Sequence, residues 1–265
     1  MKIIVCVKQV IDPEAPPASF KIDTAKNKAV MHGVPPVIDP YGEYAVEAGL
    51  RVKDAGGGKI MVISLGVNLL REVVKKPLAM GADELILLED ETYAGGDCWS
   101  TAYSLAMAIK KIGTFDMILC GREASDTNAG QTGPAIAEIL GLPCITLARK
   151  IEVNGSKLRI ERVNSSGYDV IESPLPAVVT VSNEIGQPRY PTVKGIMAAK
   201  KIEPVIWKPA DIGIEASGTG VNAQRTKIHR LFQPVHEGKC EFAAGESPEE
   251  MAINLAVKLR EARVL

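Results

Sequence analysis

The residues best suited to bind a ligand are concentrated between Gly121 and Thr132, where the sequence reads GREASDTNAGQT. The apolar run Met117–Cys120 before this loop predicts a buried strand, and Pro134–Leu140 after it predicts a helix. Free N–H groups and the helix dipole attract anions at a helix N-terminus, and glycines let backbone approach a ligand closely. Side-chain donors in the loop are Ser125, Thr127, Asn128, Gln131 and Thr132. The loop therefore predicts a phosphate or nucleotide site, and a polar capping loop is the alternative.

The rest of the sequence offers no catalytic constellation to accompany this loop. The loop is neither a P-loop, since no Gly-Lys-Ser/Thr follows, nor a GxGxxG fingerprint. We find no GxSxG, HExxH or SxxK motif and no Cys/His pairing, and the carboxylates are dispersed. We therefore predict no catalytic side chains, and we expect a bound cofactor to supply the chemistry.

Composition narrows the class of protein further. The chain has 265 residues, 46% hydrophobic content and a net charge of −1, which gives no electrostatic case for nucleic acid. No stretch is long enough to predict a transmembrane helix, and the apolar run at the N-terminus is too short for a signal peptide. The five cysteines contain no CxxC, and the three histidines lack ligand spacing. We expect reduced thiols, no metal site, no membrane insertion and a cytoplasmic location.

Up to residue 145, apolar strands alternate with amphipathic helices. Asp39-Pro40 is a typical helix start, with an N-cap acceptor before Pro at the first position. Alternation of this kind predicts an α/β domain whose parallel sheet has helices on both faces. The predicted strands are Lys2–Val7, Lys59–Leu65, Glu84–Leu88 and Asp116–Cys120, and the further helices are Leu69–Ala79, kinked or ended by Pro77, and Ser100–Ile112.

Around this core we expect less regular segments. Residues 18–31 resemble a β excursion, Val34–Pro40 a loop and Asn183–Lys201 an irregular stretch. Strands in an antiparallel style are predicted after residue 145, at Ile145–Val153, Lys157–Asn164, Tyr168–Glu172 and Ala177–Ser182, with a hairpin turn at Asn154-Gly155.

The C-terminal part has its own organisation. Residues 202–246 are too weakly patterned and too long for a normal loop, so we predict an arm on another subunit, with a surface wrap as the alternative. A final helix starts at Ser247-Pro248, with a capping box and an apolar stripe made of Ala252, Leu255, Leu259 and Ala262. We divide the chain into an α/β nucleotide-binding domain, residues 1–201, and a C-terminal arm and helix for a partner subunit, residues 202–265.

The strand ends near residues 7–12, 65–68 and 121–132 are expected to converge at one edge of the sheet. Ligands of open α/β sheets bind beyond the carboxyl ends of the strands. The helix start at Asp39 is expected to add a fourth wall.

Several segments, in this order, resemble the beta subunit of electron transfer flavoproteins. They are Lys8–Asp12, Asp39–Lys53, Ala79–Asp83, Gly121–Gly133, Leu175–Val181 and Pro188–Lys201. The resemblance implies an adenine-nucleotide-binding, Rossmann-like fold and a FAD-containing heterodimer with an alpha subunit, which the C-terminal arm embraces. It also implies electron exchange with a flavin-dependent dehydrogenase.

Carried onto this sequence, the resemblance implies two sets of site residues. The nucleotide site would comprise Cys6, Val7, Asp39, Pro40, Tyr41, Gly42, Leu65, Gly66, Gly121, Arg122, Glu123, Ala124, Ser125, Asp126, Thr127, Asn128, Ala129, Gly130, Gln131 and Thr132. The dehydrogenase-docking loop would fall on Asn183–Lys201, with Arg189, Tyr190, Val193, Ile196 and Met197 as docking residues. Val193 stands where the family usually has Leu, which puts a typical acyl-CoA dehydrogenase partner in question.

The resemblance also indicates a branch of the family. Gly33-Val34-Pro35, Gln131–Pro134 and Arg122 in place of the common Lys look more like electron-bifurcating members, in which the pocket holds FAD and NADH delivers electrons. Arg is a rigid bidentate donor suited to a diphosphate. One alternative is the simple branch, in which the pocket holds structural AMP. A non-redox adenylate-binding structural or regulatory subunit is the alternative of another class.

Overall fold

The computed structural model describes residues 1–25, 27–31, 33–234, 238 and 240–265. The described chain forms two compact units, residues 1–229 and residues 230–265, which are treated separately below. The first unit extends beyond the expected boundary at residue 201, because strand β13 (Val205–Trp207) pairs with the main sheet. In the described residues, no helix has the length and apolar character required to cross a membrane.

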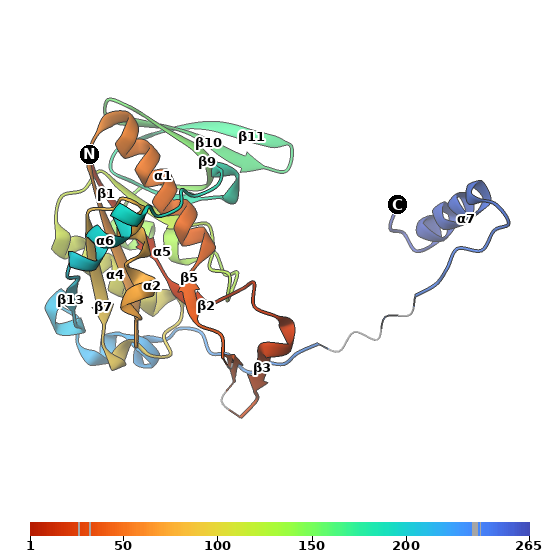
Figure 1. The fold of residues 1–265 in the computed structure, drawn as a ribbon, viewed down its shortest axis with the longest axis horizontal. Coiled ribbons are helices and arrows are strands. Elements are labelled where there is room, and N and C mark those ends of the chain that lie inside the picture. The colour runs from red at the N-terminus through yellow and green to blue at the C-terminus, as the bar shows by residue number, and fades with distance from the viewer. Residues whose placement is uncertain (26, 32, 235–237, 239) are drawn as a thin grey trace. The chain divides into compact units, whose positions relative to one another are not determined.

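The first unit is built on a nine-stranded sheet with the order β11-β10-β9-β12-β8-β1-β6-β7-β13 (Figure 1). The strands from β9 to β13 in this order run parallel to one another. Their bounds are β1 (Lys2–Val7), β6 (Lys59–Gly66), β7 (Glu84–Glu89), β8 (Met117–Gly121), β9 (Cys144–Asn154) and β12 (Ala177–Val181). The alternating pattern predicts this for β1, β6, β7 and β8. The expected antiparallel style was wrong for Ala177–Ser182, because β12 pairs in parallel with both β8 and β9.

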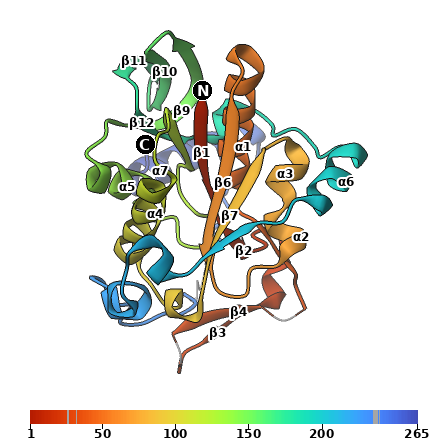
Figure 2. The same ribbon diagram turned by 90° about the vertical axis from the view of Figure 1, so that its left-hand side faces the viewer.

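Helices cover both faces of this sheet. Helices α1 (Pro40–Gly56), α2 (Arg71–Val74), α3 (Lys76–Met80) and α6 (Val193–Lys201) contribute to the core on one face. Helices α4 (Cys98–Ile112) and α5 (Thr132–Leu140) pack on the other face, as Figure 2 shows. The predicted α/β architecture is confirmed.

The antiparallel extension is also confirmed. Strands β10 (Lys157–Asn164) and β11 (Gly167–Pro174) continue the sheet beyond β9 with antiparallel pairing. Asn154 pairs with Lys157, and Gly155 between them has a φ of 62°, so the hairpin turn lies where Asn154-Gly155 predicts it.

Two small sheets lie outside the main sheet. Strands β3 (Phe20–Asp23) and β4 (Lys28–Met31) form an antiparallel pair within the predicted β excursion. Strands β2 (Gln9–Ile11) and β5 (Pro36–Ile38) form the other, although residues 34–40 were expected to be a loop. Strand β5 was not predicted because prolines surround it and proline disfavours strands. Its partner, β2, is also distant in the sequence.

Two helix predictions were wrong in detail. The single helix Leu69–Ala79 is two short helices, α2 and α3, because Pro77 cannot continue an α-helix and the chain restarts ahead of it. The segment Asn183–Lys201 is irregular only in its first part, since α6 begins at Val193. Thr192 caps α6 by accepting a hydrogen bond from Gly195 N at 3.0 Å, a start that the neighbouring prolines obscured.

Short 3-10 turns complete the first unit. They are Pro17–Ser19, Glu91–Tyr93, Asn183–Ile185, Pro209–Ile212, Ala216–Gly218 and Gly220–Ala223. The last three lie in the weakly patterned segment 202–246, which also contains β13 and has no longer helix or strand among its described residues.

The second unit contains helix α7 (Pro248–Glu261). Ser247 Oγ accepts a hydrogen bond from Glu250 N at 3.2 Å, which confirms the predicted cap. In the expected capping box, the Glu250 carboxylate accepts from the backbone N of the cap residue, Ser247. It accepts instead from Glu246 N, one residue earlier, at 2.8 Å.

Candidate functional site

The carboxyl ends of β1, β6 and β8 meet at one edge of the sheet. Cys6 pairs with Cys120 of β8 and with Ile63 of β6, so the segments that follow these strands leave from the same edge. The start of α1 adjoins this edge, because a Cβ on Gly42 would lie 3.5 Å from Val7 Cα. The structure thus brings together the four segments that the sequence places in the nucleotide site.

Asp39 locks the loop after β8 to the start of α1. Its side chain is buried, with 2% of the residue exposed, and its Oδ1 accepts a hydrogen bond from Tyr41 N at 2.9 Å. Its Oδ2 accepts from both the N and the Oγ of Ser125, each at 2.7 Å. With both oxygens occupied, Asp39 acts as a structural tie between two walls of the site.

Gly121 allows the two walls to touch. A Cβ on residue 121 would lie 2.6 Å from Tyr41 Cβ and 2.7 Å from the Tyr41 carbonyl carbon. A similar restriction applies at Gly133, where a Cβ would lie 2.6 Å from Thr180 Cγ2. Any side chain at either position would push apart the elements that shape the loop.

Arg122 is held over the aromatic ring of Tyr41. Its guanidinium carbon lies 4.9 Å from the ring centroid, and its Nη2 donates to Tyr41 Oη at 3.2 Å. Its Nε and Nη2 also donate to Glu123 Oε1 at 3.0 and 2.9 Å. Burial opposes the charge of Arg122, but the interactions with Glu123 and Tyr41 together outweigh it and raise the pKa of Arg122. Burial raises the pKa of Tyr41 as well, so this phenol stays protonated at neutral pH.

The acidic side chains of the loop are neutralised locally. Asp126 forms an ion pair with Lys8 at 2.7 Å, and Glu123 forms one with Arg122. Unpaired carboxylates would repel a phosphate, so this pairing removes an electrostatic obstacle to an anionic ligand. Lys8, directly after β1, lies in one of the segments that resemble the family, but it was not among the predicted site residues.

The last part of the loop forms a turn that leads into α5. The Ala124 carbonyl accepts from Thr127 N at 3.1 Å and Asn128 N at 2.7 Å, which closes a turn. Gly130 then takes a φ of 62° and leads the chain into α5. Within the described residues the Gln131 side chain makes no capping bond, so no side chain at the N-cap occupies the first N–H groups of α5, those of Thr132 and Gly133.

The remaining predicted residues line the strand ends. Leu65 and Gly66 close β6, and the segment behind them is held by Gln9, whose Oε1 accepts from Leu70 N at 2.8 Å. Gln9 is a positioning residue that sequence reasoning did not select. The neighbouring Cys6 thiol, together with burial, raises the pKa of Cys120, which keeps Cys120 protonated and consistent with a small apolar role.

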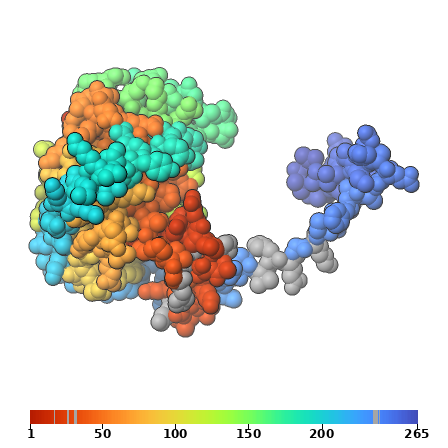
Figure 3. Space-filling view, viewed as in Figure 1, coloured from red at the N-terminus to blue at the C-terminus, as the bar shows by residue number. Residues whose placement is uncertain are grey.

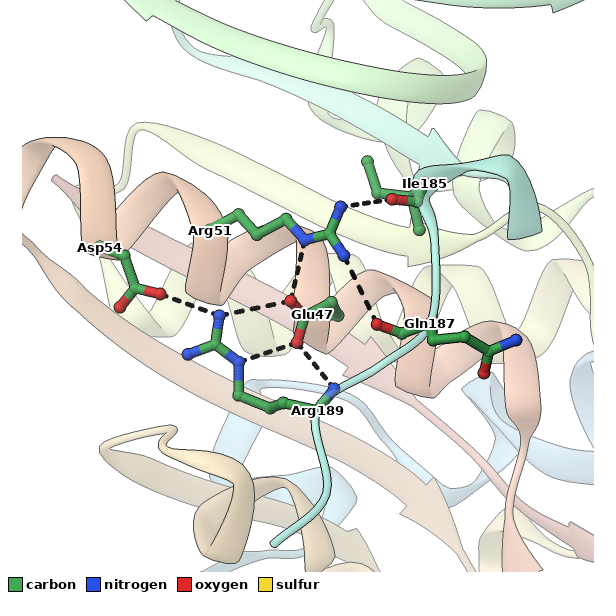
Figure 4. A network of polar contacts seen from close by, with 6 residues as sticks. All are labelled: Glu47, Arg51, Asp54, Ile185, Gln187 and Arg189. Carbon is green, nitrogen blue, oxygen red and sulfur yellow. Dashed lines mark hydrogen bonds and ion pairs between the residues drawn. The ribbon is translucent and has the colours of Figure 1, made fainter.

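A second set of predicted residues lies on and before α6, where a buried carboxylate fixes the chain (Figure 4). Glu47 of α1 is 4% exposed and accepts from Arg189 Nε at 2.9 Å, Arg189 N at 3.1 Å and Arg51 Nε at 2.8 Å. Arg51 also donates to the carbonyls of Ile185 and Gln187, and Arg189 pairs with Asp54 at 2.8 Å. Burial disfavours the Glu47 carboxylate, but the hydrogen bonds from Arg189 and Arg51 outweigh it and lower the pKa of Glu47.

The cluster of Glu47, Arg51 and Arg189, called the clamp below, separates the predicted docking residues into two groups. Arg189 is engaged in pinning the segment to α1. Tyr190, Val193 and Met197 point to solvent, with 91%, 80% and 55% of each residue exposed, and Ile196 is also exposed. The clamp therefore holds an apolar, solvent-exposed segment in a fixed position.

Comparison with known proteins identifies the family of this fold and site. The model of the electron transfer flavoprotein domain matches residues 27–212. The chain belongs to the electron transfer flavoprotein family. It is 37% identical over 266 residues, covering all of both chains, to the caffeyl-CoA reductase-Etf complex subunit CarD of Acetobacterium woodii. It is 38% identical over 260 residues, 96% of this chain and 95% of the relative, to the electron transfer flavoprotein subunit beta of Megasphaera elsdenii.

A relative with a different name matches over a smaller share of both chains. Protein FixA of Azorhizobium caulinodans is 34% identical over 242 residues, 88% of this chain and 85% of the relative. The match to CarD runs through the C-terminal segment, so α7 belongs to the part that the two electron transfer flavoprotein family members share. The beta-subunit resemblance of the sequence is confirmed.

Proposed function

We propose that this electron transfer flavoprotein beta subunit binds FAD at the loop Gly121–Thr132 and works in a heterodimer with an alpha subunit. In that complex electrons pass between NADH, the alpha-subunit flavin and a flavin-dependent dehydrogenase, as in flavin-based electron bifurcation. Bound FAD would supply the redox chemistry, and the protein chain would bind and orient it. The observation that carries the proposal is the start of α5, which has no side-chain cap, at the edge where β1, β6 and β8 end.

The geometry of the loop fits a dinucleotide. Gly121 and Gly133 keep the walls close, and the carboxylates of the loop are all paired, so negative charge on a ligand meets donors. Arg122 Nη1 makes no hydrogen bond to the residues that the structure describes, which leaves it free for a phosphate oxygen. Since the Tyr41 ring and Glu123 hold the guanidinium, little freedom is lost when it binds a ligand.

The comparison with CarD supports the bifurcating branch. That relative is, by its name, a subunit of a caffeyl-CoA reductase-Etf complex, and its whole length aligns with this chain. We propose a related assembly here, with NAD(H) as electron donor or acceptor. The acceptor would be a flavin-dependent dehydrogenase that contacts Tyr190, Val193, Ile196 and Met197, positioned by the clamp on Arg189.

For the alpha subunit, we propose that residues 202–265 supply much of the contact surface. The described residues of α7 include Met251, Ile253, Leu255 and Val257, all exposed in the chain by itself. Apolar side chains on more than one side of a helix indicate a helix that is covered elsewhere.

Cofactor content of the copurified heterodimer tests the proposal. We expect two FAD per heterodimer, separated from AMP by chromatography after denaturation. Gly121→Ala should remove one FAD and leave the other, because its Cβ would collide with Tyr41. Gly56→Ala, where nothing lies within 4 Å of the new Cβ, is the matched control and should keep both.

Other outcomes would redirect the assignment. One FAD with one AMP would place the chain in the simple branch. A colourless complex that binds AMP or ATP and no flavin would replace the redox proposal with that of a non-redox adenylate-binding subunit.

A further inference from the structure

The segment that follows β13 is fixed, near its end, to α4 and to the loop before that helix. Thr219 is 1% exposed, and its Oγ1 lies 3.0 Å from Ser104 Oγ of α4. Gly220, with a φ of 56°, packs so closely on the loop that a Cβ there would lie 2.0 Å from the Thr92 carbonyl oxygen. Figure 3 shows the segment after β13, in light blue, on the surface of the first unit.

Asp97 holds the last part of this segment. Its Oδ1 caps α4 by accepting a hydrogen bond from Ser100 N at 2.9 Å, which leaves Oδ2 for another partner. Oδ2 accepts from Arg225 N and Thr226 N, each at 2.8 Å, and from Thr226 Oγ1 at 3.0 Å. Hydrogen bonds to an ionised carboxylate are stronger than neutral ones. One aspartate therefore ties the start of α4 to residues 225 and 226.

Two side-chain contacts accompany these bonds. The guanidinium carbon of Arg225 lies 3.3 Å from the centroid of a Trp99 ring, and Gln224 Nε2 donates to the Gly95 carbonyl oxygen. Five residues make these contacts with their side chains, and we call them the arm anchor: Asp97, Trp99, Gln224, Arg225 and Thr226.

The arm anchor does not serve to bury apolar surface. Residues 224–226 are all exposed, so fixing them adds little hydrophobic stabilisation to the core. The bonds fix instead the point from which the chain continues toward residue 230, where the second unit begins. Ile228 and Phe232 follow the anchor, with 64% and 56% of each residue exposed.

We propose that Asp97 is a positioning residue for the alpha subunit, because it holds residues 224–226 so that the chain after them starts from a fixed point. Ordering a flexible segment upon binding costs conformational entropy, so a segment that is already fixed binds its partner more tightly. This inference rests on the proposed function, which assigns residues 202–265 to the alpha-subunit contact. It adds a residue of the loop after β7, which acts without touching the partner.

Asp97→Asn in the complete heterodimer tests the inference. Asn caps helices about as well as Asp, but its side chain has a single acceptor oxygen, which cannot serve both Ser100 N and the N–H groups of residues 225 and 226. The dissociation constant of the heterodimer, measured by sedimentation of a dilution series, should rise about tenfold. Arg225→Ala, which removes the contact with Trp99 and leaves Asp97 intact, should raise it about threefold.

Asp116→Asn is the matched control. The Asp116 carboxylate also accepts a hydrogen bond from a backbone N–H group, that of Lys2 at 2.7 Å, but it lies before β8, at the amino end of that strand. This variant should leave the dissociation constant within about twofold of the wild-type value. An equal rise in Asp116→Asn and Asp97→Asn would overturn the inference, since it would reflect a general loss of stability.

Amide hydrogen exchange separates positioning from stability. In the Asp97→Asn chain, before the alpha subunit is added, exchange should become faster at residues 219–229 and stay unchanged in β1, β6 and β8. Faster exchange throughout the sheet would overturn the inference. So would faster exchange at residues 219–229 in a variant whose dissociation constant stays within about twofold of wild type.

The FAD content of the heterodimer tests the proposed function separately. A wild-type heterodimer without FAD would overturn that proposal, while a tenfold rise in the dissociation constant upon Asp97→Asn would still support the arm anchor. A chain that forms no complex with an alpha subunit would overturn both.

Discussion

Helices α1 and α7 begin with the same local device and differ in what surrounds them. Asp39 and Ser247 each cap the helix with a side-chain acceptor, at 2.9 and 3.2 Å, and each is followed by Pro at the first helical position. Helix α1 buries eight of its 17 residues against β1, β6 and β8. In α7, whose 14 residues are all described, none is buried.

The comparison shows that a few neighbouring residues decide where a helix starts, whereas its stability depends on what the helix packs against. Caps contribute about 1 kcal/mol, whereas most helix stability in proteins comes from packing of an apolar face. Met251 and Leu255 lie on one side of α7 and Ile253 and Val257 on another, so α7 has apolar surface to cover on two sides. Helix α1 finds its partner within the chain, and we infer that α7 finds its partner in another subunit.

The largest expected effect on stability comes from introducing a charged side chain into α1, compared with the same change in α7. Val46→Asp places an unpaired carboxylate in the α1 core and should lower the free energy of unfolding of the isolated subunit by about 4 kcal/mol. Leu255→Asp in exposed α7 should change it by less than about 0.5 kcal/mol, yet weaken heterodimer affinity at least about tenfold. Urea unfolding and titration with the alpha subunit measure the two effects. Equal destabilisation by both variants would refute the contrast.

Removing the buried carboxylate of α1 should have the next largest effect. Glu47→Ala leaves Arg51 and Arg189 without their shared acceptor and should cost about 3 kcal/mol of unfolding free energy. The segment before α6 should also become susceptible to proteolysis near residue 189. Glu249→Ala, an exposed glutamate at the start of α7, serves as the control and should have little effect on either measurement. A Glu47→Ala variant as stable as the wild type would show that the clamp is dispensable.

The two caps should differ for the same reason. Asp39→Ala removes the α1 cap and the tie to Ser125, so we expect a loss of about 2 kcal/mol together with weaker nucleotide binding. Ser247→Ala removes only a cap and should cost at most about 1 kcal/mol, without any change in nucleotide binding. Thermal unfolding and equilibrium dialysis with FAD and AMP distinguish these cases. If Asp39→Ala retains full nucleotide affinity, the proposed tie does not shape the site.

The smallest expected effect concerns the end of the first unit. Burial opposes ionisation of Asp97, but hydrogen bonds from Ser100 N, Arg225 N and Thr226 outweigh it and lower the pKa of Asp97 to about 2. Because the folded-state pKa lies below the unfolded one, this group stabilises the fold above about pH 4 and loses that contribution as the pH falls toward 2. After solvent screening we expect about 1 kcal/mol.

The measurement is the stability difference between wild type and Asp97→Asn in urea at a series of pH values. The difference should be constant above pH 5 and shrink below about pH 4. A difference that grows on acidification would contradict the assignment.

The elements that meet at the carboxyl ends of β1, β6 and β8 could be predicted from the sequence because each carries a local pattern. An apolar strand, a glycine-rich polar loop and a helix start follow one another directly at residues 117–140, and the parallel sheet puts strand ends together. Pairings between distant segments carried no such pattern. Strand β5 and strand β13 are only three residues long, and their partners, β2 and β7, are distant in sequence.

The sequence by itself determined the alternation of strands and helices, the position of the loop Gly121–Thr132 and the starts of α1 and α7, because propensity, glycine placement and capping act over a few residues. Tertiary structure decided the use of particular side chains. Asp39 became a tie to Ser125 and Glu47 an anchor for Arg189, since residues 86 and 142 positions apart meet only after the sheet has formed. It also decided which apolar surfaces stay uncovered, and those at α6 and α7 are where we place the partners.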